Sequence, residues 1–96
     1  MEDVALPQHY PSLKREEIRV VREAYVKEQK GLCAYCQTPL VEEPAAHIQA
    51  AWIDRRLFPP NMFKYPVHLH HDHETGMTIG AVHARCNAYA WQYDGQ

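Results

Sequence analysis

The 96-residue sequence lacks several features that would place it at once in a broad class of protein. It has no apolar run near the roughly 20 residues that span a bilayer, so no membrane segment is expected. The opening MEDVALPQHYP lacks the basic start and the apolar core of a signal peptide, and we therefore expect a cytoplasmic protein. Repeats and long linkers are also missing, so we expect one domain over residues 1–96.

A positive net charge is missing as well. The chain carries 10 Lys and Arg against 12 Asp and Glu, which gives a formal net charge of -2. Because phosphate contacts supply most non-specific affinity for DNA, this balance counts against broad nucleic-acid binding. The basic residues are nevertheless grouped, at Lys14, Arg15, Arg19, Arg22, Lys27 and Lys30, at Arg55, Arg56 and Lys64, and at Arg85. This grouping fits either a locally basic face or a solvated surface of mixed charge.

Cysteine is scarce, and the number of cysteines is odd. Of the three, Cys33 and Cys36 form a C-x-x-C pair, and Cys86 lies far along the chain. Without a secretion signal, this pattern favours a metal site over a disulfide. His83 and Cys86 repeat the same spacing, and Cys3His is a common ligand set of closed structural zinc sites. We therefore predict one structural zinc at these four residues, the alternative being a surface histidine and a buried free cysteine.

The residues that are present predict an α+β chain, beginning with an arm and a helix. Prolines favour an extended arm over residues 1–11, and Ser12 is placed to cap a helix over residues 12–30 that ends at Gly31. Helical spacing puts an apolar stripe on this helix, formed by Ile18, Val21 and Tyr25. The same spacing gives a basic stripe, formed by Arg15, Arg19 and Arg22.

The rest of the chain predicts a hairpin and a final helix. Between about 42 and 66, Pro44 is placed to start a short helix through AAHIQAAWIDRRLF, with Ile48 and Trp52 on one face. VHLHHD alternates as a strand does, HETG is typical of a turn, and MTIGAV predicts a second strand. HARCNAYAWQY is expected to close the chain as a helix.

The segment LHHDHETG crowds three histidines and an aspartate into four consecutive residues, 70–73. In a regular strand, His70 and His71 would point to opposite faces, whereas a bulge would let both serve one site. A histidine run alone also fits an adventitious metal binder or a solvated surface. The function of the histidine run can therefore be inferred only together with the motifs around it.

Taken together, GLCAYCQTPL, LHHDHETGMTIGA and HARCNA resemble the HNH endonucleases of the ββα-metal superfamily, above all the phage recombination endonuclease VII type. That family has G-x-C-x-x-C, an LDHDH segment, a TG turn, a short RG strand and C-x-x-C-N. The resemblance covers about residues 30–90, interrupted by an insertion at about 42–66. It implies a ββα-metal (His-Me finger) core with a structural zinc knuckle, over residues 31–96, and the N-terminal helix before it. The family's zinc ligands match Cys33, Cys36, His83 and Cys86, with histidine replacing the usual fourth cysteine.

The resemblance also implies catalytic roles. His71 matches the general base, and Asn87 matches a metal ligand at the start of the last helix. His70 stands where the family usually has an aspartate ligand. His73 matches the later histidine of the LDHDH segment, near the scissile phosphate, and His68 matches a histidine just ahead of that segment.

The expected function is therefore metal-dependent cleavage or nicking of DNA, in a phage-encoded protein that acts in a bacterial host cell as a monomer or homodimer. Its divalent cation is magnesium or manganese, or cobalt or nickel, because a nitrogen ligand at His70 suits borderline ions. DNA contacts are expected from Arg15, Arg19, Arg22, Arg55, Arg56, Lys64 and Arg85.

Departures from the family leave other readings open. The insertion is long, the chain ends soon after Asn87, and Ile79 replaces the arginine of the RG strand. The insertion either contacts DNA or is a surface segment packed by Ile48, Trp52 and Phe58. The alternative function is a zinc-stapled DNA-binding module without catalysis, and a further one is an adaptor with an idle histidine cluster.

Overall fold

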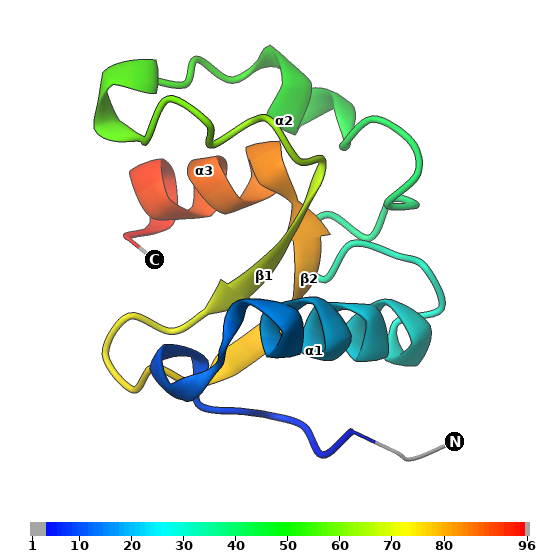
Figure 1. Ribbon diagram of the computed structural model, residues 1–96. Helices are drawn as coiled ribbons and strands as arrows, with labels where there is room; N and C mark the ends of the chain where they lie inside the picture. The colour runs from blue at the N-terminus through cyan, green and yellow to red at the C-terminus, as the bar shows by residue number, and fades with distance from the viewer. Residues whose placement is uncertain (1–3, 96) are drawn as a thin grey trace.

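A computed structural model describes residues 4–95 as a small α+β protein built on one antiparallel hairpin (Figure 1). The α+β class predicted from the sequence is confirmed. The helices are α1 (Arg15–Glu28), α2 (Ala46–Ala50) and α3 (Ala84–Asp94), and the strands are β1 (Val67–His71) and β2 (Thr78–His83). Short 3-10 turns occur at Tyr10–Ser12 and Arg55–Leu57. Within residues 4–95, no helix has the length and apolar character needed to cross a membrane.

The turn between β1 and β2 is fixed by its own side chains and by a glycine. Asp72 Oδ1 accepts hydrogen bonds from the backbone N–H groups of Glu74 (2.7 Å) and Thr75 (3.0 Å). Gly76 follows with a φ of +78°, and a Cβ there would lie 3.0 Å from the imidazole of His9. The turn therefore requires glycine for both backbone conformation and space. The two strands and the turn occur where the sequence predicts them.

The hairpin is irregular beside the histidines. His70 pairs with Gly80, but the next residue, His71, pairs with Thr78, so that Ile79 is an extra residue on β2. This register shift is a bulge, and bulges redirect side chains next to functional sites. The alternation of side chains along β1 is thus interrupted between His70 and His71.

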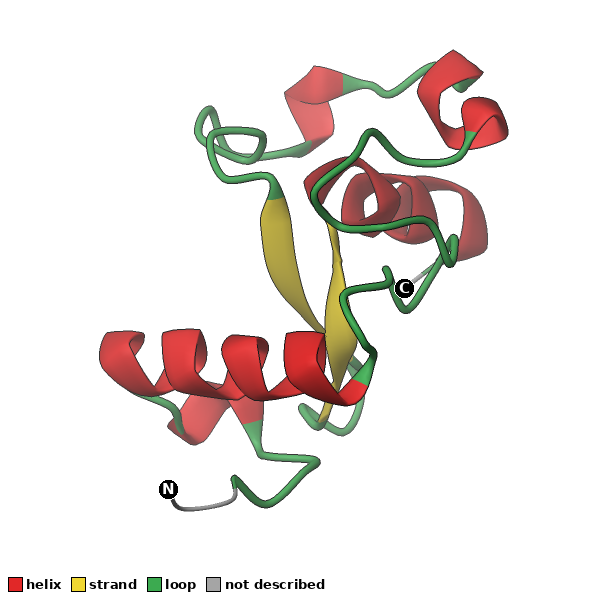
Figure 2. Cartoon of the chain, turned by 90° about the vertical axis from the view of Figure 1, so that its right-hand side faces the viewer, coloured by secondary structure: helices red, strands yellow, loops and turns green. Residues whose placement is uncertain are grey.

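Helices pack on both ends of the hairpin. Figures 1 and 2 show α1 across one end of the strands and α3 beside the other, with α2 on the outer side of α3. Both α1 and α3 contact both strands, and α2 contacts α3. The buried core consists of Val21, Tyr25, Cys33, Leu40, Ile48, Leu69, Ala81, Val82 and Cys86. Of the stripe predicted on α1, Val21 and Tyr25 are buried and Ile18 packs against them while partly exposed.

The N-terminal helix begins at Arg15, so the prediction of Ser12 as its cap is wrong. Ser12 belongs to a 3-10 turn, and the two residues after it are extended. Leu13 packs against the core, which directs the chain out of the turn before the helix starts. Lys14 is the N-cap, and its N–H donates to Glu17 Oε1 at 2.9 Å. The predicted arm ends in this turn, and its residues 1–3 lie outside the described part of the chain.

The insertion contains a shorter helix than predicted. Ile48 is buried, but Trp52 is 66% exposed, so the prediction that they share a face is wrong. The helix α2 ends at Ala50, and the guanidinium of Arg85 binds the carbonyl groups at this end. Arg85 Nε donates to Ile48 O (3.1 Å), and its Nη2 donates to the carbonyl oxygens of Gln49 (3.2 Å) and Ala51 (2.8 Å). A cation at a helix C-terminus satisfies these orphan carbonyls and the helix dipole.

Candidate functional site

The first C-x-x-C pair lies in a tight loop directly after α1. The chain folds back so that Cys33 N–H donates to Thr38 O at 2.9 Å. The N–H groups of Tyr35 (3.4 Å) and Cys36 (3.5 Å) donate to Cys33 Sγ. Backbone donors of this kind stabilise a thiolate and orient it as a metal ligand.

His83 and Cys86 complete a four-residue cluster at the junction of β2 and α3. The donor atoms of Cys33, Cys36, His83 and Cys86 all lie within 4.8 Å of one another. His83 Nδ1 is 3.5 Å from Cys36 Sγ and 3.6 Å from Cys86 Sγ. Ligands at about 2.1–2.3 Å from a tetrahedral zinc lie roughly 3.5–3.8 Å apart, so these spacings fit the ion. The cluster could therefore hold the predicted zinc.

The imidazole of His83 is oriented for this role by its other nitrogen. Nε2 lies 3.1 Å from the carbonyl oxygen of Pro39 and 2.9 Å from that of Glu42, and an N–H on Nε2 can donate to both. That tautomer leaves the lone pair of Nδ1 directed at the sulfurs. A metal-binding histidine is usually held in this way, by a carbonyl that accepts from its second nitrogen.

The sulfurs perturb one another's ionisation. A hydrogen bond from Cys86 lowers the pKa of Cys33 to about 4, while the same contact and burial raise the pKa of Cys86. The three thiols thus share a limited negative charge when only protons are present. A zinc ion would replace these protons and let all three sulfurs carry charge, because only thiolates act as ligands.

A second polar cluster adjoins the first through the peptide bond between Cys86 and Asn87. Asn87 Oδ1 lies 2.9 Å from His70 Nδ1, and Asn87 Nδ2 lies 3.1 Å from His68 Nδ1. The amide therefore accepts from His70 and donates to His68. His68 and His70 are two residues apart on β1, which puts both on the side of the strand that meets α3. The structure thus brings His70 and Asn87 together, as the sequence predicts.

His71 lies next to this cluster but contacts a different element. Its ring stacks on Tyr10, with centroids 4.0 Å apart and planes 7° apart. Burial lowers the pKa of His71, and the neighbouring charges of His73 and His70 lower it further. The ring of His73 lies 5.0 Å from that of His71. His71 is therefore a mainly neutral imidazole near pH 7, and such an imidazole can accept a proton.

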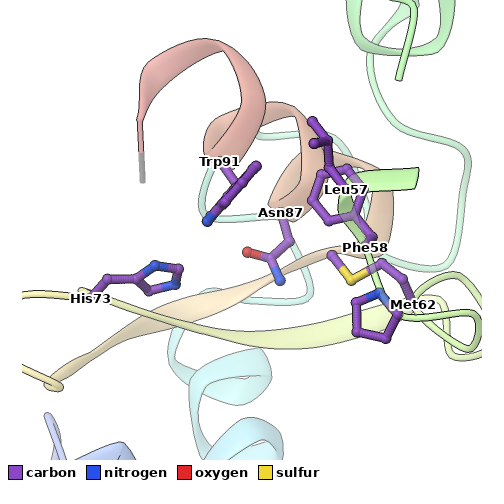
Figure 3. A pocket seen from close by; sticks show the side chains of 7 residues that line it. Leu57, Phe58, Met62, His73, Asn87 and Trp91 are labelled. Atoms are coloured by element: carbon purple, nitrogen blue, oxygen red, sulfur yellow. The ribbon is translucent and has the colours of Figure 1, made fainter. Parts of the chain in front are cut away.

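A cavity of about 260 Å³ opens beside Asn87 (Figure 3). Figure 3 shows His73 and Trp91 on one side of Asn87, and Leu57, Phe58 and Met62 of the insertion on the other. The residues that line it are Leu57, Phe58, Pro59, Met62, His73, Asn87 and Trp91. The insertion thus packs on α3 and forms one wall of a hollow that reaches the histidines. The sequence analysis did not predict this cavity. The spacing of four residues between Asn87 and Trp91, which puts both on one face of a helix, was the signal for its α3 side.

The basic stripe predicted on α1 lies in part near the second cluster. Arg15 and Arg19 are exposed, and Arg19 Nε is 3.8 Å from Glu23 Oε1. Arg22 is half-buried and close enough to His68 for its charge to add to the effect of burial in lowering the pKa of that histidine. Of the three arginines, Arg22 is therefore the one whose charge reaches this cluster.

The basic residues of the insertion lie on its outer side. Arg55 is placed over the ring of Phe63, 4.4 Å from its centroid, and Lys64 is 5.6 Å from the ring of Tyr65. The exposed Arg56 makes two contacts of 3.0 Å with Asp54. Arg85 instead caps α2, where its guanidinium donates to three carbonyl oxygens.

Comparisons with protein-family models, with curated proteins and with solved structures each found no match. The proposed function therefore depends on the geometry of the two clusters and the cavity.

Proposed function

We propose that the chain is a metal-dependent DNA endonuclease of the HNH type. In this proposal β1, β2 and α3 form a ββα-metal core. Zinc bound by Cys33, Cys36, His83 and Cys86, the zinc cluster, stabilises this core. The observation that supports this best is the 2.9 Å contact between His70 and Asn87, which are 17 residues apart in the chain. These are the two residues that the resemblance assigns to the catalytic cation, and they meet beside the zinc cluster.

The residues of the second cluster fit a divalent cation. Adjacent ligands at about 2.1 Å from an octahedral ion lie about 3 Å apart. The 2.9 Å distance from Asn87 Oδ1 to His70 Nδ1 is close to this value. His68 instead meets the amide nitrogen of Asn87 and holds that side chain in place. An amide oxygen and imidazole nitrogens are neutral ligands, so the ion would keep its charge for DNA phosphate. Nitrogen ligands favour manganese, cobalt or nickel over magnesium.

Each residue has a separate task in phosphodiester hydrolysis. His71 accepts the proton of the attacking water as general base, an effect typically worth about 10²- to 10⁴-fold in rate. Asn87 and His70 would hold the divalent cation, which would supply the positive charge that binds the scissile phosphate and stabilises the leaving oxygen. His73, between His71 and the cavity, contacts the phosphate.

The test is a nicking assay on supercoiled plasmid, with purified protein that retains its zinc. We expect nicking with manganese and none without an added divalent ion. Asn87→Ala should abolish nicking, whereas Asn61→Ala, which changes an exposed asparagine of the insertion, should nick as the parent does. All three proteins should contain equal zinc. Linear product appearing early would indicate a dimer that cuts both strands, and nicked circles alone a monomer.

A second candidate is a zinc-stapled DNA-binding module without catalysis. The replacement of the family's aspartate by His70 favours it, because a cation loses a negatively charged ligand there. Retention of labelled DNA by the protein, with no nicking by any divalent ion, would support this module and contradict the endonuclease.

A further inference from the structure

The cavity beside Asn87 has aromatic walls that the proposed hydrolysis does not use. Trp91 lies one helical turn after Asn87, on the same face of α3. Phe58 meets its ring edge-on, with centroids 5.5 Å apart and planes 70° apart. The Trp91 side chain nevertheless remains 40% exposed, so a large flat ring stays accessible at the cavity.

The wall formed by the insertion is tied to α3 by hydrogen bonds. Gln92 Oε1 accepts from the N–H of Asp54 at 2.9 Å, and Gln92 Nε2 donates to Trp52 O at 3.1 Å. The hydroxyl of Tyr93 donates to the same carbonyl oxygen at 2.6 Å. A cavity that is already formed binds its ligand without the cost of ordering a loop.

Size and chemistry limit what fits here. A volume of about 260 Å³ lies just below the roughly 300 Å³ at which sites for drug-sized ligands begin. No carboxylate, lysine or arginine is among the residues that line the cavity, as far as the described chain shows. The site therefore suits one small, flat, uncharged group. Its polar residues are His73, which is proposed to contact the scissile phosphate, and Asn87, which is proposed to hold the cation that binds this phosphate.

We propose that the cavity receives one unpaired nucleobase, stacked on Trp91, from a DNA strand whose backbone lies at Asn87. This proposal rests on the proposed endonuclease function and narrows its substrate to DNA that has an unstacked nucleotide, such as a bulge. Every base has a flat face, and stacking on an aromatic side chain is worth roughly 5- to 150-fold in affinity. A nucleotide is also the ligand that carries a flat uncharged group and a phosphate a few bonds apart.

The low net charge of the chain also favours recognition by base stacking over recognition by phosphate contacts. Net charge is -2, and two of the arginines predicted to contact DNA are engaged with protein groups, Arg56 with Asp54 and Arg85 with α2. Five of the seven predicted contacts remain, on a chain that is acidic overall, so phosphate contacts, which normally dominate affinity for duplex DNA, should be weak here. Base stacking depends little on salt, so binding to a bulged substrate should weaken less with added salt than binding to a plain duplex.

The experiment compares three labelled DNAs by fluorescence anisotropy, without added divalent ions. They are a paired duplex, the same duplex with one bulged adenine, and that bulge with an abasic nucleotide. We expect the bulged DNA to bind about tenfold more tightly than the other two, within the range for stacking on one aromatic ring. Trp91→Ala should remove this preference, and Trp91→Phe should keep part of it. Trp52→Ala, which removes the exposed tryptophan of the insertion, should change nothing.

A direct readout uses Trp52→Phe, which leaves Trp91 as the single tryptophan of the chain. Its fluorescence should be quenched by the bulged DNA and not by the abasic one. Equal affinity for the three DNAs, or a preference for the bulge that survives Trp91→Ala, would overturn the cavity proposal. Plasmid nicking by the same preparations tests the endonuclease separately, so that nicking with equal affinities would leave the proposed function standing. Failure to bind any DNA would overturn both.

Discussion

The two polar clusters share a peptide bond, between Cys86 and Asn87, and yet they differ in every property that matters for a metal. The zinc cluster has three sulfurs and one nitrogen, and Cys33, His83 and Cys86 are buried. Its donors are fixed by backbone N–H groups and carbonyls. The second cluster has no sulfur, offers neutral nitrogen and amide oxygen, and borders a cavity that opens to solvent. The start of α3 thus carries a residue of a four-donor cluster that could hold zinc and, directly after it, the residue proposed to hold the catalytic cation.

Ligand number explains the difference in role. Four protein donors complete a tetrahedral zinc and leave no position for water or substrate, which is the mark of a structural site. The second cluster offers fewer protein donors, and an ion there would need water and phosphate to complete its shell. A zinc held by Cys86 would also fix the position of Asn87, the residue proposed to hold the catalytic cation.

Loss of a zinc ligand should have the largest effect. Cys36→Ala should remove zinc and unfold the domain, because structural zinc contributes on the order of 10 kcal/mol to the folding of small domains. The checks are elemental analysis for zinc and thermal unfolding by circular dichroism. Gln37→Ala, an exposed change in the same loop, serves as the control. Natively purified, folded parent protein without zinc would refute this role.

Loss of the proposed base should affect rate and not fold. His71→Ala should lose roughly 10²- to 10⁴-fold in nicking rate, the usual worth of general base catalysis, while zinc content and DNA binding persist. His47→Ala, at an exposed position of α2, should keep full activity. A His71→Ala protein that nicks as fast as its parent would exclude His71 as the base.

Loss of the partner of Asn87 should have an intermediate effect. His68→Leu removes the acceptor that holds the Asn87 amide, and groups that orient a metal ligand are typically worth about 10- to 100-fold in metal affinity or activity. His68→Gln keeps an acceptor and should recover part of the loss. Titration of nicking against manganese concentration measures it. An unchanged titration in His68→Leu would show that the hydrogen bond does not position Asn87.

The smallest change should be in the divalent cation with which the protein is most active. Magnesium favours oxygen ligands, whereas manganese, cobalt and nickel accept nitrogen more readily. The parent should therefore be more active with these three ions than with magnesium, and His70→Asp should move the preference toward magnesium. A nicking assay over the metal series on both proteins measures this shift. The same magnesium dependence in both would mean that His70 is not a ligand.

The sequence was informative wherever the determining residues are close together. Two C-x-x-C-like spacings predict the residues of the Cys3His cluster, and alternation with a TG turn predicts the hairpin, because both patterns act over a few residues. The cavity escaped prediction because Phe58 and Trp91 meet only in the folded chain. The length of α2 was not predicted for the same reason, since Arg85, which caps the end of that helix, is distant in the sequence. The bulge at Ile79 likewise leaves no mark in the sequence.

The N-terminal arm has a consequence for solubility. A two-stranded sheet leaves unpaired backbone groups along its outer edges, and such edges invite pairing with other chains. Here the outer edge of β2 is occupied: Thr78 N–H donates to Gln8 O at 2.8 Å, and Tyr10 N–H donates to Gly76 O at 2.8 Å. Farther along, the Gln29 side-chain amide accepts from the N–H of Ala81 (2.8 Å) and donates to its carbonyl (2.9 Å). The arm and the Gln29 side chain thus cover the outer edge of β2. Removal of residues 1–9 should expose part of this edge to pairing with other chains, and so promote self-association.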